Sequence, residues 1–405
     1  MTELVLLNIS GEDKPGLTAA ITELLGGYDI DILDIGQAVI HNYLTLGILI
    51  HIPVDFDLVL EQVLTEARKF ELRVKSSHVA ASSYEDWVDL QGRSRFILTL
   101  LARRVKAMHI AQVSKVIAAN GLNIDAIVRL SGRVPIEGPD DSVKACVEFA
   151  LKGEPADAIA FRSQLMTVCA ELDIDIAVQE DSIYRRNRRL IAFDMDSTLI
   201  TTEVIDELAH LAGVGEKVSA VTEQAMTGQI DFKESLRQRV SLLKGLPESS
   251  LKTVAERLPL TEGVEHLFLM LNKLGYKTAI LSGGFTYFAS HLQRQLGVDY
   301  VHANKLEIVE GKLTGNVIEP IVDAERKAYL LRELAIAEGI SLEQCIAVGD
   351  GANDLMMLAT AGLGIAFHAK PIVKENAEQS ISTLGLDSIL YLMGIRDRDA
   401  SKLLG

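Results

Sequence analysis

Cysteine is scarce in this sequence. Cys146, Cys169 and Cys345 are the only three in 405 residues, and they stand far apart. Neither a disulfide framework nor a zinc site fits this number and spacing. A reducing compartment is the default for such a chain, and we expect the three thiols to lie in the core.

Positive charge is also in deficit. The sequence has 40 Lys and Arg against 56 Asp and Glu, a formal net charge of -16. Nucleic acids and anionic membranes are bound by basic surfaces that displace counterions, so neither is an expected partner. A basic run at 185–189 stands directly before an apolar segment, and we interpret it as a solvated domain boundary.

A membrane-spanning segment is not expected either. The longest stretch without a charged side chain, 35–54, contains several polar residues and Pro53. Two buried strands around a turn at His41–Asn42 explain it better than a membrane helix. The opening residues, Met1-Thr2-Glu3, resemble no secretory signal, because a basic and an apolar segment are missing. We therefore expect a cytoplasmic protein.

What is present is the composition of a soluble globular chain. Hydrophobic residues make up 48% of the sequence and charged residues 24%, as in ordinary folded domains. At roughly 100 to 200 residues per domain, the length predicts two to four domains. The patterns described below predict three, at 1–80, 94–180 and 185–405.

The first domain has the pattern strand, helix, strand, strand, helix, strand. Leu17, Ile21 and Leu24 recur at helical spacing after a glycine-containing turn. This order of elements is that of a ferredoxin-like fold. The predicted strands are 4–9, 30–39, 45–52 and 71–77, and the predicted helices are 17–25 and 56–69.

A second copy of the pattern occupies 94–180. Its strand 96–102 and helix 109–120 lead to Leu122-Asn123-Ile124-Asp125, which echoes Tyr28-Asp29-Ile30-Asp31 about 94 residues earlier and indicates an internal duplication. The polar segment 82–95 is predicted to be a linker. The two copies resemble tandem ACT domains, which are ligand-sensing modules attached to enzymes of amino-acid metabolism.

The loop Gly11-Glu12-Asp13-Lys14-Pro15-Gly16 matches the ligand loop of ACT domains. Glycine lets backbone N–H groups approach the carboxylate of a small zwitterion and Asp13 can meet its ammonium group, so Asp13 and Gly16 are candidate effector contacts. A tight turn in which Asp13 caps the following helix explains the same residues. In the second copy, Arg103–Met108 has lost the Asp and the Gly, which speaks against effector binding there.

From residue 185 onward, apolar strands alternate with helical segments. Strands are predicted at 190–193, 278–282 and 345–348, each followed by a loop and a helix. This alternation indicates an α/β domain with a doubly wound parallel sheet, whose ligands bind at the carboxyl ends of the strands.

Two carboxylates follow the first of these strands, in Asp194-Met195-Asp196-Ser197-Thr198. Asp194 is suited to attack phosphorus in line, and Asp196 to protonate the leaving oxygen and then to activate water. A carboxylate that attacks a phosphate dianion meets charge repulsion, which calls for a hard cation such as Mg2+.

Groups for the same chemistry follow the later strands. Asp350, flanked by Gly349 and Gly351, is a candidate metal ligand, and Asp354 is in a supporting position. Each motif has an ordinary structural explanation by itself, but their order and spacing favour a common site.

Two further motifs can bind a phosphoryl group. Ser282 and Gly283 offer a hydroxyl and backbone N–H groups, and Lys327, in a predicted helix at 323–336, can neutralise the charge that builds up.

This ordered set resembles the four motifs of the haloacid dehalogenase superfamily, over 189–405. The resemblance implies that Asp194 is the nucleophile and that Asp196 is the acid/base, whose main-chain carbonyl also binds Mg2+. It also implies that Asp350 completes the metal ligands and that Ser282 and Lys327 contact the phosphate.

The insertion between Asp196 and Ser282 is predicted to be a helical cap at about 202–260, which excludes water and selects the substrate. Its residues resemble the substrate pocket of phosphoserine phosphatases. The resemblance implies substrate contacts by Glu203, Met226, Phe232, Arg239 and Asn353. Arg239 can clamp an α-carboxylate while Glu203 pairs with an α-ammonium group. Ordinary surface charges and core residues are the alternative explanation.

The resemblance therefore implies an enzyme that hydrolyses phosphoserine through an aspartyl-phosphate, as the last step of serine biosynthesis. Serine is the first hypothesis for an effector at the ACT domains, whose edges would also form a homodimer. Two alternative functions remain. One is a phosphotransferase that passes the phosphoryl group from Asp194 to an alcohol, and the other is a non-enzymatic sensor with an inactive site. A P-type pump shares the GDGxND motif but requires spanning helices.

Overall fold

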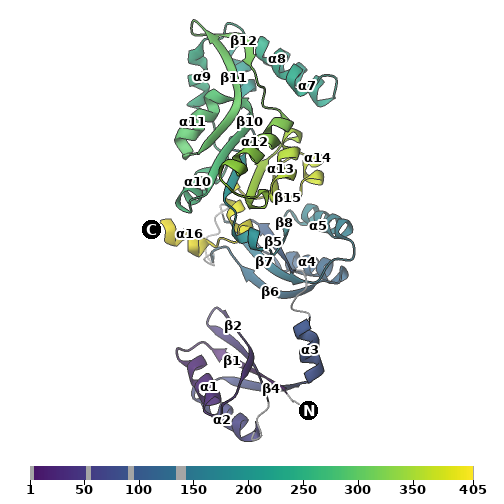
Figure 1. Ribbon diagram of the computed structural model, residues 1–405, viewed down its shortest axis with the longest axis vertical. Coiled ribbons are helices and arrows are strands. Elements are labelled where there is room, and N and C mark those ends of the chain that lie inside the picture. The colour runs from purple at the N-terminus through teal and green to yellow at the C-terminus, as the bar shows by residue number, and fades with distance from the viewer. Residues whose placement is uncertain (1–3, 52–55, 90–94, 134–142, 405) are drawn as a thin grey trace. The chain divides into compact units, whose positions relative to one another are not determined.

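The computed structural model describes residues 4–51, 56–89, 95–133 and 143–404 (Figure 1). Its internal contacts divide the chain into two compact units, Met1–Arg93 and Ser94–Gly405, which are described separately. Among the described residues, no helix combines the length and the apolar character needed to cross a membrane.

The first unit has the predicted βαββαβ order. Its four strands form an antiparallel sheet in the order β2-β3-β1-β4, and its two helices pack against one face through Ile21, Leu25 and Val63. The elements are β1 Leu4–Glu12, α1 Leu17–Gly26, β2 Ile32–Ile40, β3 Tyr43–His51, α2 Phe56–Lys69 and β4 Arg73–Val79. The ferredoxin-like prediction is confirmed.

Two details of this unit differ from the sequence prediction. The turn at His41–Asn42 is present, but β2 is largely exposed, with Ile40 81% accessible, because it pairs only with β3 and lies at the edge of its sheet. The segment predicted as a linker contains helix α3, Ala81–Asp89. Tyr84 and Trp87 lie one turn apart on this helix, with ring centroids 5.8 Å apart.

The second unit begins with a second βαββαβ fold, whose sheet has the order β6-β7-β5-β8. Leu98 and Leu100 of β5 pack against its own helices, whereas Leu101 points to the other face and joins the core of the following domain. A strand buried on both faces explains why 96–102 is apolar at every position except Thr99. The elements are β5 Arg95–Ala102, α4 Ala107–Ala119, β6 Asn123–Arg129, β7 Ala145–Lys152, α5 Ala158–Leu172 and β8 Asp175–Glu180.

The remainder of this unit is built on a seven-stranded sheet in the order β12-β11-β10-β9-β13-β14-β15. Strands β9 to β11 and β13 to β15 run parallel, and β12 is antiparallel to β11. The strands are β9 Leu190–Phe193, β10 Lys277–Phe285, β11 Tyr300–Val309, β12 Lys312–Ile318, β13 Cys345–Gly349, β14 Leu363–Phe367 and β15 Gln379–Ile381.

Helices cover both faces of this sheet (Figure 1). Ile191 and Phe193 of the central strand pack with α10 and α11, and Leu190 and Ala192 pack on the opposite face with α12 and α13. The alternation along one strand therefore builds two cores and confirms the doubly wound prediction. The helices are α10 Val264–Lys273, α11 Thr286–Leu296, α12 Ala324–Ala337, α13 Leu355–Thr360, α14 Pro371–Asn376, α15 Ile389–Leu392 and α16 Asp397–Leu404.

Five helices lie between β9 and β10 in the chain, and the first four of them lie where the cap was predicted. These four are α6 Val204–Leu211, α7 Gly215–Met226, α8 Phe232–Ser241 and α9 Glu248–Ala255. The segments that leave and re-enter the sheet lie side by side, because Ile200 and Leu260 form a β-bridge. The carboxylate of Asp231 accepts a hydrogen bond from the Glu234 N–H at 2.8 Å and so fixes the start of α8.

The basic run at 185–189 is only partly solvated, because Arg186 and Arg189 are exposed but the other two arginines are buried. Arg185 is buried and pairs with Glu148 of β7. Arg188 is also buried and donates to the carbonyl oxygens of Glu343 and Cys345 at 2.9 and 3.2 Å. These partners come from distant parts of the sequence, so only the folded chain reveals them. The expectation for the thiols is confirmed for Cys146 and Cys345, whereas Cys169 is half-buried.

Candidate active site

The carboxyl end of β9 places two aspartates in the interior of the protein. Asp194 is 4% exposed and Asp196 is 9% exposed. The Asp194 N–H donates to the carbonyl oxygen of Val348 at 2.9 Å and so continues the pairing of β9 with β13. The backbone then turns at Ser197, whose φ is 55°, and the chain leaves the sheet toward the cap.

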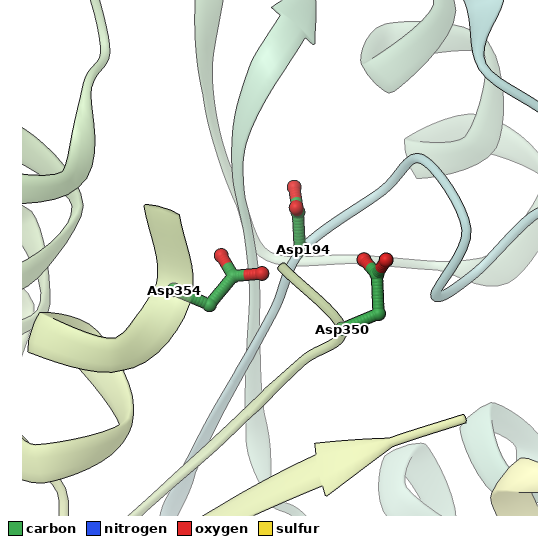
Figure 2. Close-up of side chains that lie close together, drawn as sticks. All are labelled: Asp194, Asp350 and Asp354. Atoms are coloured by element: carbon green, nitrogen blue, oxygen red, sulfur yellow. The ribbon is translucent and has the colours of Figure 1, made fainter. Parts of the chain in front are cut away.

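Three carboxylates gather at this edge of the sheet. Oxygen atoms of Asp194, Asp350 and Asp354 all lie within 4.8 Å of one another (Figure 2). Asp350 and Asp354 come from the loop and the first helical turn after β13. Gly349 is required here, because a Cβ at this position would lie 2.4 Å from the carboxyl carbon of Asp354.

A buried lysine bridges two of these carboxylates. The Lys327 Nζ lies 2.9 Å from Asp194 Oδ2 and 2.7 Å from Asp354 Oδ1, and its side chain is completely buried. Burial alone would lower the pKa of Lys327, but the two carboxylates raise it above its ordinary value. The ammonium group therefore stays charged and holds the nucleophile candidate in place.

The acidic groups carry more negative charge than this lysine offsets. Burial, followed by the charges of Asp194 and Asp354, raises the pKa of Asp350 to about 7. Burial, then Glu203 and Asp194, raises the pKa of Asp196 well above its usual range. Burial and these neighbouring charges therefore favour the protonated form of Asp196, which is the form a general acid requires.

The phosphate-binding candidates lie opposite Asp196, at the end of β10. Ser282 Oγ accepts a hydrogen bond from the Gly284 N–H at 2.9 Å. A Cβ at Gly284 would lie 2.5 Å from Asp196 Oδ2, so glycine allows this loop to approach the acid. The loop is fixed by Asn304, whose Nδ2 donates to the Gly283 carbonyl at 2.7 Å.

Asn304 was missed by the sequence reasoning. It is fully buried, and its Oδ1 accepts from the Val322 N–H at 2.7 Å, so one side chain joins the β10 loop to the segment before α12. In the sequence it is one of several polar residues in the strand 300–309, with His302, Lys305 and Glu307 close by, so no pattern singles it out.

A cavity of about 860 Å3 lies between the cap helices and the strand ends. Its walls include ten of the residues predicted for the site, namely Asp194, Asp196, Glu203, Met226, Phe232, Arg239, Ser282, Gly283, Asp350 and Asn353. Lys327 and Asp354 do not line the cavity. Lys327 contacts Asp194, which does line it, and Asp354 contacts Lys327. Met226 is 69% exposed and stands at the mouth.

Two opposite charges on the cap side are held away from bulk water. Burial lowers the pKa of the Arg239 guanidinium, although Glu203 acts in the opposite sense. Burial likewise raises the pKa of Glu203, whose Oε1 accepts a hydrogen bond from Ser197 Oγ at 3.1 Å. A cavity with a cation and an acid in its wall suits a zwitterionic ligand.

The sequence reasoning also missed an ion pair in the cavity wall. Lys233 and Asp323 both line the cavity, and Lys233 Nζ lies 2.8 Å from Asp323 Oδ2. Lys233 belongs to cap helix α8, and Asp323 is the residue before α12. The pair therefore joins the cap to the helix that carries Lys327.

The candidate effector loop lies in the first unit. Gly16 has a φ of 87° and precedes α1, a conformation that favours glycine. Helix α1 has no side-chain cap, so the alternative in which Asp13 caps it is wrong. Asp13 is exposed, and its N–H donates to the Asn42 carbonyl at 2.8 Å.

In the second copy, the altered loop forms hydrogen bonds with another segment of the same unit. Arg103 donates two hydrogen bonds to the carboxylate of Glu262, at 2.9 and 2.6 Å. The residue that replaces the first position of the ligand loop thus contacts the segment that precedes α10.

The family comparisons agree with this architecture. Residues 188–362 match haloacid dehalogenase-like hydrolases, and residues 3–76 and 94–179 match two ACT domain families. The fold and the site are thus those of a haloacid dehalogenase-like hydrolase that carries two ACT domains.

Individual relatives extend over nearly the whole chain. The chain is 39% identical to a phosphoserine phosphatase of Mycobacterium tuberculosis, over 96% of this chain and 93% of that one. It is 40% identical to a phosphoserine phosphatase of Streptomyces coelicolor, and the match covers 96% of this chain and 92% of that one. A solved structure, the probable phosphoserine phosphatase of Vibrio cholerae, has a TM-score of 0.59 at 36% identity and covers 77% of this chain and 89% of its own. The chain belongs to the phosphoserine phosphatase family.

Proposed function

We propose that this protein hydrolyses O-phospho-L-serine to L-serine and phosphate through an aspartyl-phosphate on Asp194, as the last step of serine biosynthesis. The observation that carries the proposal is the single cavity that joins Asp194 and Asp196 to Glu203 and Arg239. The names of the relatives at about 40% identity point to the same substrate.

The chemistry of the substrate matches the charges in the wall. Arg239 can bind the α-carboxylate of phosphoserine through two parallel hydrogen bonds, and Glu203 can accept from its α-ammonium group. Phe232 closes the cavity over the loop at Gly283, since a Cβ at Gly283 would lie 3.0 Å from Phe232 Cζ. Excluding water strengthens both charge pairs.

The acidic cluster fits a magnesium ion. Its donors are carboxylate oxygens, and burial together with the neighbouring negative charges raises the pKa of Asp350. Asp194, Asp350 and the main-chain carbonyl of Asp196 would hold the ion. When bound, Mg2+ would offset the repulsion between Asp194 and the phosphate dianion.

The reaction then proceeds in two half-reactions, and the residues of the chain have a defined role in each. In the first, Asp194 forms a bond to phosphorus, the bond to the serine oxygen breaks, and Asp196 gives its proton to that oxygen. In the second, Asp196 takes a proton from a water molecule that attacks phosphorus, and Asp194 is released with free phosphate. Ser282 and Lys327 hold the phosphoryl oxygens throughout.

A substrate panel tests this proposal. The purified protein with Mg2+ should release phosphate from phosphoserine much faster than from other phosphomonoesters, and acid quenching should trap one phosphoryl group on the peptide that contains Asp194. Adding alcohol acceptors distinguishes a phosphotransferase, which would form new phosphate esters. A well-folded protein that releases no phosphate with Mg2+ would support the sensor alternative.

We further propose regulation by an amino acid, with serine as the first candidate, at Asp13 and Gly16 of the first ACT domain. The exposed edge strand β2 supports pairing of two copies into a homodimer. Serine should change the activity or the sedimentation of the wild type but not of Asp13→Ala. We assign the domains to 1–80, 94–180 and 185–405, with the cap at about 202–260.

A further inference from the structure

Helix α8 makes three side-chain contacts from the cap to the sheet domain. Phe232 rests on Gly283 of the phosphate-binding loop. Lys233 pairs with Asp323 at 2.8 Å, and Arg237 pairs with Glu319 at 2.7 Å. The cap is also joined to the sheet by backbone hydrogen bonds between 245–248 and 311–313. Helix α8 therefore bears side-chain contacts that would form when the cap closes over the cavity and break when it opens.

Asp323 caps helix α12, whereas the Glu319 carboxylate accepts a hydrogen bond from the Ile321 N–H within the loop at 3.0 Å. The Asp323 Oδ1 accepts a hydrogen bond from the Arg326 N–H at 2.9 Å and so caps α12. Its Oδ2 contacts Lys233 of the cap. One carboxylate thus fixes the start of a helix with one oxygen and binds the cap with the other.

The capped turn leads directly to Lys327. The Lys327 N–H donates to the Asp323 carbonyl at 2.9 Å, in the first helical hydrogen bond of α12. One turn of helix therefore lies between the cap contact and the ammonium group that bridges Asp194 and Asp354. A shift of Asp323 would move this turn, and the packed interior transmits small displacements of rigid elements.

We infer that Asp323 is a positioning residue that couples closure of the cap over the substrate to the placement of Lys327 against the nucleophile. This inference rests on the proposed phosphatase reaction and deepens it. Coupling of this kind is reciprocal: a cap held closed steadies Lys327, and a steady Lys327 favours the closed cap.

The ion pair is of modest strength, which suits a contact that must break in every turnover. The Lys233 side chain is 48% exposed and that of Asp323 is 16% exposed. Asp323→Asn keeps an acceptor for the helix cap, because Asn caps helices as well as Asp does, but removes the charge. Lys233→Met removes the other charge. Each variant should lower kcat about 2-fold to 5-fold.

The matched control is Arg237→Met. It breaks an ion pair of similar length between the same helix and the same loop, but Glu319 does not cap α12. Arg237→Met should raise KM and leave kcat unchanged, whereas Lys233→Met should lower kcat. Lys233→Arg should restore it. The double variant Lys233→Met, Asp323→Asn should be no slower than either single variant, because both remove the same interaction.

Amide hydrogen exchange gives a readout that needs no turnover. Exchange in the first turns of α12, 324–330, should increase in Lys233→Met and stay unchanged in Arg237→Met. Kinetics on a small aryl phosphate, which needs Lys327 but not the serine pocket, should show the same loss of kcat. The inference is overturned if the losses in the double variant multiply, or if Lys233→Met and Arg237→Met behave alike in kinetics and exchange. A loss on phosphoserine with normal turnover of aryl phosphate in Lys233→Met would also overturn it, because Lys233 would then act on the serine pocket. Wild-type protein that turns over aryl phosphate but not phosphoserine would instead contradict the proposed substrate.

Discussion

Lys327 and Asp354 form an ion pair of 2.7 Å in which both side chains are completely buried. The same ammonium group contacts Asp194 at 2.9 Å. One cation thus offsets the charges of two buried carboxylates, and neither carboxylate has bulk water nearby that could solvate it if the cation were lost. This relationship determines how the site responds to mutation.

Lys327→Met should destabilise the protein and also stop turnover. It leaves two adjacent carboxylates buried without a cation, which typically costs about 3–5 kcal/mol. Calorimetry should show a clear fall in the unfolding temperature. The additional change Asp354→Asn should recover part of it, because one uncompensated charge is removed. Lys252→Met is the control, since Lys252 pairs with Glu256 on the surface at 3.7 Å and should have no measurable effect.

Asp194→Asn should abolish turnover while the protein remains folded. Asn has nearly the shape of Asp but cannot form an acyl phosphate, so kcat should fall by at least about 10⁴-fold. Circular dichroism checks the fold, and acid-quenched mass spectrometry should find no phosphorylated peptide. Residual activity within about 100-fold of the wild type would remove Asp194 from the role of nucleophile.

Arg239→Ala should impair phosphoserine selectively. Losing a hydrogen-bonded charge pair to the α-carboxylate is worth about 1.5–3 kcal/mol, or roughly 10-fold to 150-fold in kcat/KM. A small aryl phosphate lacks this carboxylate and should be nearly unaffected. Arg294→Ala, on the exposed face of α11, serves as the control. Equal losses on both substrates would contradict the assignment of the pocket.

Magnesium should stabilise the protein more at pH 8 than at pH 5. The pKa of Asp350 is raised from 3.8 to about 7 in the metal-free protein, so the folded state binds this proton more tightly than the unfolded state. The stability that results is present below about pH 4 and is lost as the pH rises through about 7. A cation replaces the lost proton, and it competes with that proton at low pH.

Unfolding temperatures with Mg2+ and with a chelator, measured at both pH values, check this prediction. Asp350→Asn should remove most of the pH dependence and most of the Mg2+ effect. An equal gain from Mg2+ at pH 5 and pH 8 in the wild type would mean that the ion binds away from Asp350.

The fold was predictable because its strands and helices have recognisable local sequence patterns. The apolar run 190–193 is the strand β9, and the periodic segment 56–69 is the helix α2. Strand ends that carry Asp, Ser or Gly then converge by the geometry of a parallel sheet, which brought Asp194, Ser282 and Asp350 into one cavity.

The remainder depends on partners that are distant in the sequence. Arg185 is buried because Glu148 lies against it, and Asn304 is buried because it receives the β10 loop. Nothing in the sequence distinguishes Lys233 and Asp323 from surface charges, because their pairing depends on how the cap packs against the sheet domain. Helix α3 was missed because its segment is short and mostly polar, although Tyr84, Trp87 and Val88 stand at helical spacing.

The second ACT domain shares its interior with the catalytic part. Leu101, Cys146 and Ala177 from its sheet belong to the same core as Ile191 and Phe193. A fragment starting at residue 185 would lose this cover, and its bared apolar surface should make it aggregate. A fragment starting at residue 94 retains it. The two copies thus differ in what they stabilise, since the first has a core of its own and the second shares one with the catalytic sheet.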